Sequence, residues 1–133
     1  MKGGGTMGEL ALELRMTLRL FFGGEKCFGP GPAALLEATD RLGSLRAAAA
    51  EADMAYSKAW TSLRACEQAL GFPLLEREAG GRRGGGSRLT KEGRDLLAGY
   101  RELERRMDQE GTRLLRELLP QLAIAVSYTH LTL

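Results

Sequence analysis

A local group of positive charges lies beside a run of glycines in the sequence. Between residues 77 and 91 there are five cations and one acid, Glu78; the cations are Arg77, Arg82, Arg83, Arg88 and Lys91. Guanidinium and ammonium groups bind phosphate oxygens, and a glycine-rich backbone can follow an irregular anionic surface. The net charge of the chain is only +2, so the clustering, and not the total charge, points to a nucleic acid. On its own, such a loop is more often only a solvated surface loop.

A second set of polar side chains recurs at helical spacing just before this loop. Residues 55–70 place one stripe of mostly apolar residues inward, namely Tyr56, Ala59, Leu63, Cys66 or Glu67, and Leu70. The opposite stripe of the same helix carries polar side chains of the kind that reach base edges in DNA. The predicted base readers are Tyr56, Ser57, Lys58, Thr61 and Arg64, and the predicted phosphate contacts are Arg82, Arg83, Ser87 and Arg88. Trp60 is expected to pack against the basic hairpin.

Catalytic and metal-binding groupings are not predicted. His130 is the only histidine and lies in the tail, and Cys27 and Cys66 are far apart and are expected to be buried thiols. The glycine-rich loop lacks the Gly-Lys-Ser/Thr ending of a phosphate-binding loop. We therefore expect no enzyme activity, no cofactor and no metal. The apolar runs are too short to span a bilayer and no secretory signal pattern is present, which predicts a cytoplasmic protein.

The elements that must position these side chains follow from periodicity and breakers. Alternating apolar residues predict a strand over residues 12–22, ended by Gly23 and Gly24. Helices are predicted over residues 33–41, 45–52 and 55–70, with Ser44 as an N-cap and Gly43 and Gly71 as C-terminal stops. The alanine-rich second helix should let its neighbours approach closely. Residues 72–78 and 88–90 form a predicted β-hairpin around the glycine loop, and Thr90 caps a last helix that ends at Pro120.

This order of elements predicts a mostly α protein with a small β component, a winged helix-turn-helix with a long C-terminal dimerisation helix. In that plan a helix enters the major groove and a basic hairpin follows the phosphates beside it. The expected organisation is an N-terminal extension over residues 1–11, the DNA-binding domain over 12–90, the linker and dimerisation helix over 91–120, and a tail over 121–133. The end of the tail, residues 127–133, resembles cloning or sequencing adaptor sequence as much as a continuation of the domain, and we place no function there.

The last helix carries an apolar stripe close to a heptad spacing. A small domain is not expected to bury this stripe completely, which predicts a homodimer. The expected interface residues are Leu96, Tyr100, Leu103 and Met107.

Several segments together resemble the N-terminal domain of ModE-type molybdate-responsive regulators, and more distantly the helix-turn-helix domains of LysR-type regulators. They are Gly43-Ser44-Leu45 with the alanine helix, Tyr56-Ser57-Lys58-Ala59-Trp60, Leu74-Leu75-Glu76-Arg77, and the glycine-rich loop leading into Leu89-Thr90-Lys91-Glu92-Gly93-Arg94. The resemblance runs from about residue 14 to residue 104. It implies that residues 55–70 are the recognition helix, that residues 80–88 are the wing, and that the first strand and the last helix form the dimer.

Full-length regulators of this type continue into C-terminal oxyanion-binding domains, which have no counterpart in the sequence at hand. We therefore expect double-stranded DNA and a second copy as partners, and no molybdate binding. The function predicted is sequence-specific transcriptional regulation. The alternative is a winged-helix module that binds another protein and has no specific contact with DNA.

Overall fold

The computed structural model describes residues 14–77 and 86–122. The predicted N-terminal extension, the tip of the wing with Arg82 and Arg83, and residues 123–133 lie outside the described residues. Contacts divide the chain into two compact units. One unit is Thr17–Glu102, and the described part of the other consists of residues 14–16 and 103–122.

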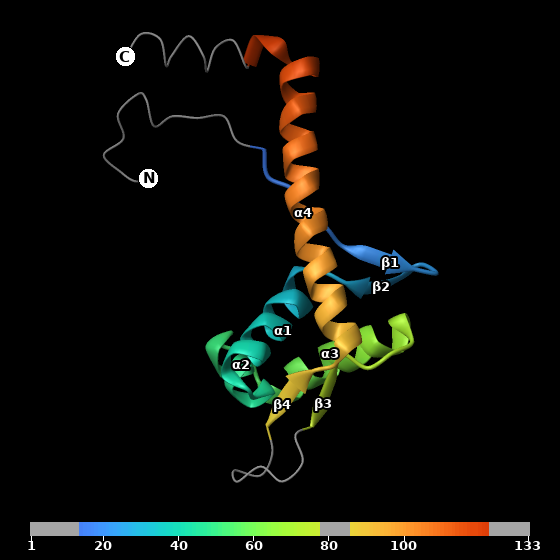
Figure 1. The fold of residues 1–133 in the computed structure, drawn as a ribbon, viewed down its shortest axis with the longest axis vertical. Coiled ribbons are helices and arrows are strands. Elements are labelled where there is room, and N and C mark those ends of the chain that lie inside the picture. Colours follow the sequence, from blue (N-terminus) through green and yellow to red (C-terminus); the bar gives the residue numbers. More distant parts are fainter. Residues whose placement is uncertain (1–13, 78–85, 123–133) are drawn as a thin grey trace, which may run out of the picture. The chain divides into compact units, whose positions relative to one another are not determined.

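Four helices and four short strands make up the described chain (Figure 1). In order they are β1 (Leu20–Phe22), β2 (Glu25–Phe28), α1 (Pro30–Leu42), α2 (Leu45–Glu51), α3 (Tyr56–Leu70), β3 (Leu75–Arg77), β4 (Ser87–Leu89) and α4 (Lys91–Leu118). The strands form two separate antiparallel pairs, β1 with β2 and β3 with β4. The prediction of a mostly α winged helix-turn-helix fold is therefore confirmed.

The three helices before the wing agree closely with the sequence predictions. The Ser44 hydroxyl accepts a hydrogen bond from the Ala47 N–H at 3.0 Å, which confirms the predicted cap of α2. Gly43 and Gly71 follow α1 and α3 as left-handed C-caps, as expected. The α1 helix begins three residues earlier than predicted because Pro30 suits the first helical position. The buried residues of α2 are Leu45, Ala48 and Ala49, so two of its three buried side chains are small where it contacts α1 and α3.

The prediction of one long strand at the N-terminus was wrong. In the described part of the predicted 12–22 segment, residues 14–22, only Leu20–Phe22 is a strand, and β2 was missed. Gly23 and Gly24 have φ values of 60° and 84°, so the glycines make a tight hairpin turn in which Phe22 pairs with Glu25. The two glycines therefore turn the chain into a second strand, and do not simply end the first.

The hydrophobic core of the Thr17–Glu102 unit includes residues from α1, α2, α3, β2 and the start of α4. Its largest fully buried apolar side chains are Phe28, Leu36, Leu74 and Leu89. Tyr100 belongs to this core: its ring meets Phe28 edge to face at 5.1 Å, and its hydroxyl donates to the Leu18 carbonyl at 2.7 Å. The prediction that Tyr100 faces a second copy needs correction, because its side chain is buried inside its own protomer.

The wing is tied to the helices around it by side-chain acceptors. The Glu67 carboxylate of α3 accepts from the backbone N–H groups of Leu74 and Leu75 at 2.8 and 3.4 Å. On the other side, the Thr90 hydroxyl donates to the Pro73 carbonyl and accepts from the Gly93 N–H, which confirms Thr90 as the cap of α4. Gly93 is needed here, since a Cβ atom at this position would collide with the Leu74 carbonyl. The hairpin therefore leaves the body of the domain in a fixed direction.

In the second unit, the outer half of α4 is a continuous helix that ends two residues before Pro120, in agreement with the predicted stop. Side chains of Leu14 and Met16 lie against Gly111. The apolar side chains Leu103, Met107, Leu114 and Leu118 remain exposed.

Thr39 gives the first prediction. Its side chain is completely buried in α1, and Oγ1 has no hydrogen-bond partner among the described residues. Replacing Thr39 by Val keeps the shape and removes the unsatisfied hydroxyl, so the free energy of unfolding should stay level or rise by about 1 kcal/mol in urea denaturation. Thr61→Val, on the exposed face of α3, is the control and should change little. A clear loss of stability in the Thr39 variant alone would contradict the prediction.

Glu67 gives the second testable prediction. Glu67→Ala leaves the Leu74 N–H, in a fully buried residue, without its acceptor, so the free energy of unfolding should fall by about 1 to 3 kcal/mol. Glu67→Gln keeps a carbonyl oxygen as an acceptor and should lose less. Equal losses in the two variants would show that the charge of Glu67, and not its role as acceptor, stabilises the wing.

Candidate nucleic-acid interface

The α3 helix presents a polar face outward because its inner face packs in the core. Ala59, Leu63 and Cys66 are buried, and this decides between Cys66 and Glu67 for the inner stripe. Burial raises the pKa of the Cys66 thiol to about 11, so this sulfur stays protonated at neutral pH. The outer positions predicted to read bases are exposed, namely Ser57, Lys58, Thr61 and Arg64, while Tyr56 is half-buried.

Most basic side chains elsewhere on the Thr17–Glu102 unit are held by acids. Arg94 contacts Asp40 at 3.3 Å, Arg101 binds Glu37 at 2.6 Å, and Arg41 pairs with Glu51. The hydrogen bond from Arg101 lowers the pKa of Glu37, which keeps this carboxylate charged in the pair. These cations are already neutralised on the surface and are less available to an anionic partner.

The cations around α3 are different. Over residues 14–77 and 86–122, no ion pair joins Lys58, Arg64, Arg46 or Arg77 to an acid. Two of them lie over aromatic rings: Arg46 stands 4.2 Å from the centre of the Tyr56 ring, and Arg64 stands 5.1 Å from that of Trp60. An aromatic ring attracts a guanidinium without neutralising its charge. This part of the surface therefore keeps its positive charge for a polyanion.

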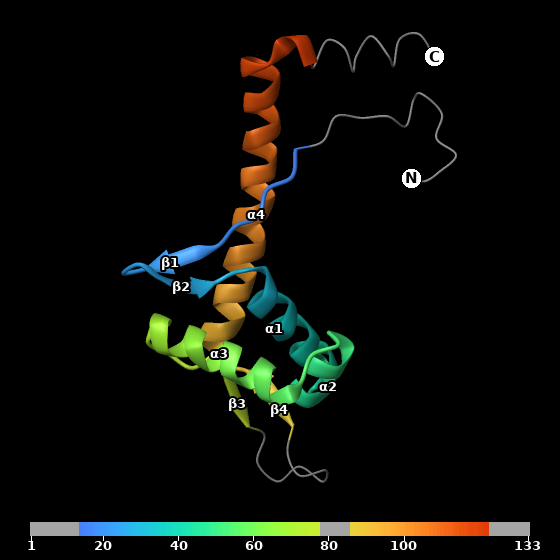
Figure 2. The same cartoon turned by 180° about the vertical axis from the view of Figure 1, so that it is seen from behind.

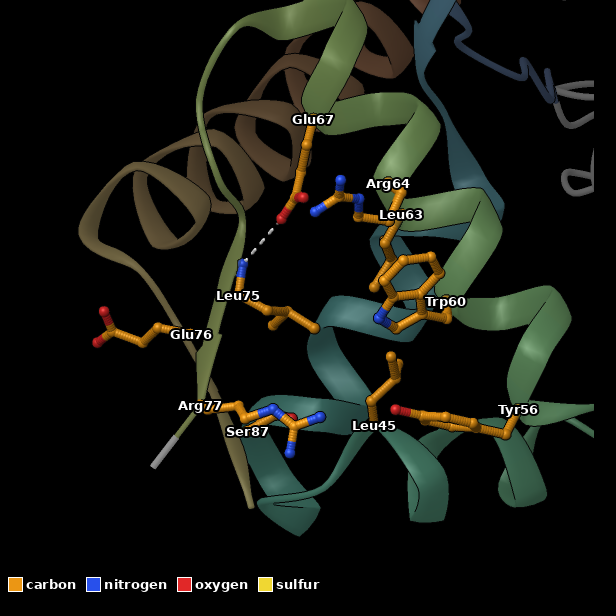
Figure 3. Close-up of a pocket in the computed structure, with 10 residues that line it drawn as sticks. All are labelled: Leu45, Tyr56, Trp60, Leu63, Arg64, Glu67, Leu75, Glu76, Arg77 and Ser87. Carbon is orange, nitrogen blue, oxygen red and sulfur yellow. Dashed lines mark hydrogen bonds between the residues drawn. The ribbon is translucent and has the colours of Figure 1, made fainter. Parts of the chain in front are cut away.

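A cleft of about 130 Å³ separates α3 from the base of the wing (Figure 3). Leu45, Leu63 and Leu75 give it an apolar lining, Trp60 and Arg64 border it from α3, and polar residues of the wing complete it: Glu76, Arg77 and Ser87. Figure 3 shows the side chains of Arg77 and Tyr56 directed toward each other, with Leu45 between them. Both residues also border a larger hollow of about 670 Å³ that continues to the turn before α2. The α3 helix and the base of the wing thus border a shared concave surface.

The predicted phosphate contacts on the wing fall into two groups. Ser87 and Arg88 are described: the Ser87 N–H donates to the Gly43 carbonyl at 3.0 Å, and Arg88 binds Glu76 across the hairpin at 2.8 Å. Arg88 is therefore already engaged by an acid, which weakens its charge toward DNA. Arg82 and Arg83 lie outside the described residues. Figure 2 shows β3 and β4 beside α3, with the two strands running away from the helices.

Sequence reasoning did not select Arg46 and Arg77 as contact residues of this surface, and it expected Trp60 only to pack against the wing. Arg77 was counted in the basic cluster, but nothing in the sequence shows that it borders a cleft shared with Tyr56. Arg46 lies in the first turn of α2, ten residues before the aromatic ring that it covers. Both placements depend on tertiary contacts.

Other kinds of site receive no support in the part of the chain that the structure describes. No cluster of three or more His, Cys, Asp or Glu side chains there could hold a metal ion. The helices in those residues are also too short or too polar to cross a membrane.

Comparisons with known proteins match the part of the chain that forms this surface. Residues 33–94 match the bacterial regulatory helix-turn-helix protein, lysR family. The chain is 44% identical over 70 residues to the molybdenum transport protein ModE of Azotobacter vinelandii, covering 53% of this chain and 26% of that protein. It is 42% identical to ModE of Herbaspirillum seropedicae, covering 74% and 32%, and 34% identical to the transcriptional regulator ModE of Haemophilus influenzae, covering 84% and 42%.

The chain thus spans less than half the length of each of these relatives. The matched segment begins within α1 and ends at the start of α4, so it contains α2, α3 and the wing. Residues 33–94 are therefore a regulatory helix-turn-helix domain of the lysR family, in a chain that is similar in sequence to ModE-type regulators.

Proposed function

We propose that the chain is a sequence-specific DNA-binding transcriptional regulator. The observation that carries this proposal is the outer face of α3, where Lys58 and Arg64 are exposed and pair with no acid of the described residues, next to a basic wing. The similarity of residues 33–94 to the lysR family supports the same function. A DNA-binding regulator must be in the same compartment as its DNA. A cytoplasmic location of this chain is a prediction.

The α3 helix supplies the base readers in this proposal. A helix in the major groove can fix the direction of side chains that read donor and acceptor patterns on base edges. Tyr56, Ser57, Lys58, Thr61 and Arg64 are assigned this role. The wing supplies phosphate contacts through Ser87, Arg88, Arg82 and Arg83, and we add Arg46 and Arg77 because they border the same surface.

The proposal includes a homodimer that reads two half-sites. The outer half of α4 keeps Leu103, Met107, Leu114 and Leu118 exposed, and side chains of this size in one helix are typical of a surface that meets a partner. A two-fold symmetric dimer matches a palindrome-like operator with one recognition helix per half-site.

A gel-shift assay tests the function directly. A pool of random-sequence duplexes is first enriched over successive rounds of binding to the chain. The probes are then the enriched duplex and a control duplex with the same bases in scrambled order. Enrichment of a shared motif, with tighter binding to it than to the scrambled duplex, is expected. If no duplex is retained, the chain is instead a protein-interaction module with this fold.

The helix and the wing should respond differently to salt. Removing one phosphate contact reduces the slope of log affinity against log salt by about 0.9, so Arg82→Ala with Arg83→Ala should flatten the slope by up to about two units and weaken both duplexes similarly. Lys58→Ala should cost about 1 to 3 kcal/mol on the enriched duplex and less on the scrambled one. Arg113→Ala, an exposed arginine paired with Glu117 at 2.9 Å, is the control. A wing variant that loses discrimination at unchanged slope would reverse the assignment.

Leu103 tests the dimer. Leu103→Glu places a charge on the exposed apolar stripe of α4 and should shift the chain toward monomer at micromolar concentration in sedimentation. Gln109→Glu adds the same charge at another exposed position of α4 and should leave the dimer intact. A monomeric wild type, or a Leu103 variant that dimerises equally well, would rule out this interface.

A further inference from the structure

Trp60 is an unusual residue to find on the outside of α3. It is the only tryptophan of the sequence, and 46% of it is exposed. Its immediate surroundings include Leu63 and Leu75, which line the cleft toward the wing (Figure 3). Packing against the wing accounts for part of the ring and leaves the exposed part unexplained.

Trp60 also makes a contact with Arg64. The two residues are one helical turn apart, and the Arg64 Cζ atom lies 5.1 Å from the centre of the indole ring. Trp gives the strongest attraction for a guanidinium among the aromatic side chains. In Figure 3 the Arg64 guanidinium lies between Trp60 and Glu67.

Neither acid of the cleft holds Arg64. Glu67 accepts from the backbone of Leu74 and Leu75, and Glu76 binds Arg88. Within the described residues Arg64 has no ion pair, so the indole ring is the contact that restricts its guanidinium. An exposed arginine without such a contact populates many rotamers. Binding to a base would then cost side-chain conformational entropy.

We propose that Trp60 is a positioning residue that holds the Arg64 guanidinium for bidentate contact with the O6 and N7 atoms of a guanine. This inference rests on the proposed function, in which α3 lies in the major groove. Trp60 then sets the preference for guanine at one base pair through Arg64, without reading that base itself. The planar fork of a guanidinium suits these two acceptors only when its direction is fixed.

The free protein tests the contact without DNA. Because Trp60 is the only tryptophan, its fluorescence reports on this side chain alone. Arg64→Ala uncovers one face of the ring and should increase quenching by acrylamide, whereas Lys58→Ala, a cation of the same helix that is not over the ring, should not. Equal quenching in wild type and the Arg64 variant would overturn the proposed contact.

Binding to the enriched duplex and to its single base-pair variants tests the consequence. Arg64→Ala should reduce discrimination at one guanine by about tenfold or more. Trp60→Leu, which keeps an apolar side chain in the cleft but has no aromatic face, should lose preference at the same guanine, and Trp60→Phe should retain much of it. Combining Trp60→Leu with Arg64→Ala should lose no more than Arg64→Ala alone. Lys58→Ala should affect a different base pair.

The possible results separate the inference from the proposed function. If the wild type prefers no duplex sequence, the proposed function fails and the inference fails with it. If the wild type is specific, but Trp60→Leu weakens all duplexes equally or adds fully to Arg64→Ala, then Trp60 only supports the fold. Circular dichroism of each variant identifies unfolding, and the Trp60→Phe profile decides the question if Trp60→Leu does not fold.

Discussion

The geometry of the whole interface depends on how the Glu67 carboxylate holds the first strand of the wing. Two backbone N–H groups at the start of β3 donate to this one side chain of α3. The Thr90 hydroxyl bonds the Pro73 carbonyl and the first turn of α4, so the strand is held from both sides. A recognition helix and a wing can contact one duplex together only if the angle between them is fixed. These few hydrogen bonds fix it, and they place Trp60, Arg64 and Arg77 around one cleft.

Charge on the Thr17–Glu102 unit is organised by where the acids lie rather than by how many cations there are. Asp40, Glu37 and Glu51 neutralise arginines away from α3. Near α3, Glu67 is engaged by backbone N–H groups and Glu76 by Arg88, so both acids that line the cleft are occupied. A chain with a net charge of +2 can thereby present a local positive surface.

The sequence predicted the elements whose signals are local. Ser44, Gly71 and Thr90 cap or end helices through contacts with residues close by, so α2, α3 and the start of α4 were found. Gly23 and Gly24 were ambiguous, since a glycine pair either ends a strand or turns it, and only pairing with β2 decides between the two. Tyr100 was misplaced because helical spacing shows that a face is apolar and not what covers it; Phe28, 72 residues earlier, covers it here. The sequence also could not show that Arg46 and Arg77 form no ion pair with an acid of the described residues, because ion pairing depends on acids that are distant in the sequence.

The apolar positions of α4 fall into two groups by what surrounds them. One group packs in or against the core of its own unit and needs no second chain to cover it: Leu96, Leu97 and Tyr100. Leu103, Met107 and Leu114 are each more than a third exposed, in a helix otherwise dominated by charged residues. Exposed leucines at this spacing gain little in water, while a second helix could bury them as a seam. A second copy would supply that helix with the same stripe, and in the proposed dimer it would bring a second α3 to the DNA, so the exposed side chains and the proposed two-part operator would have one physical explanation.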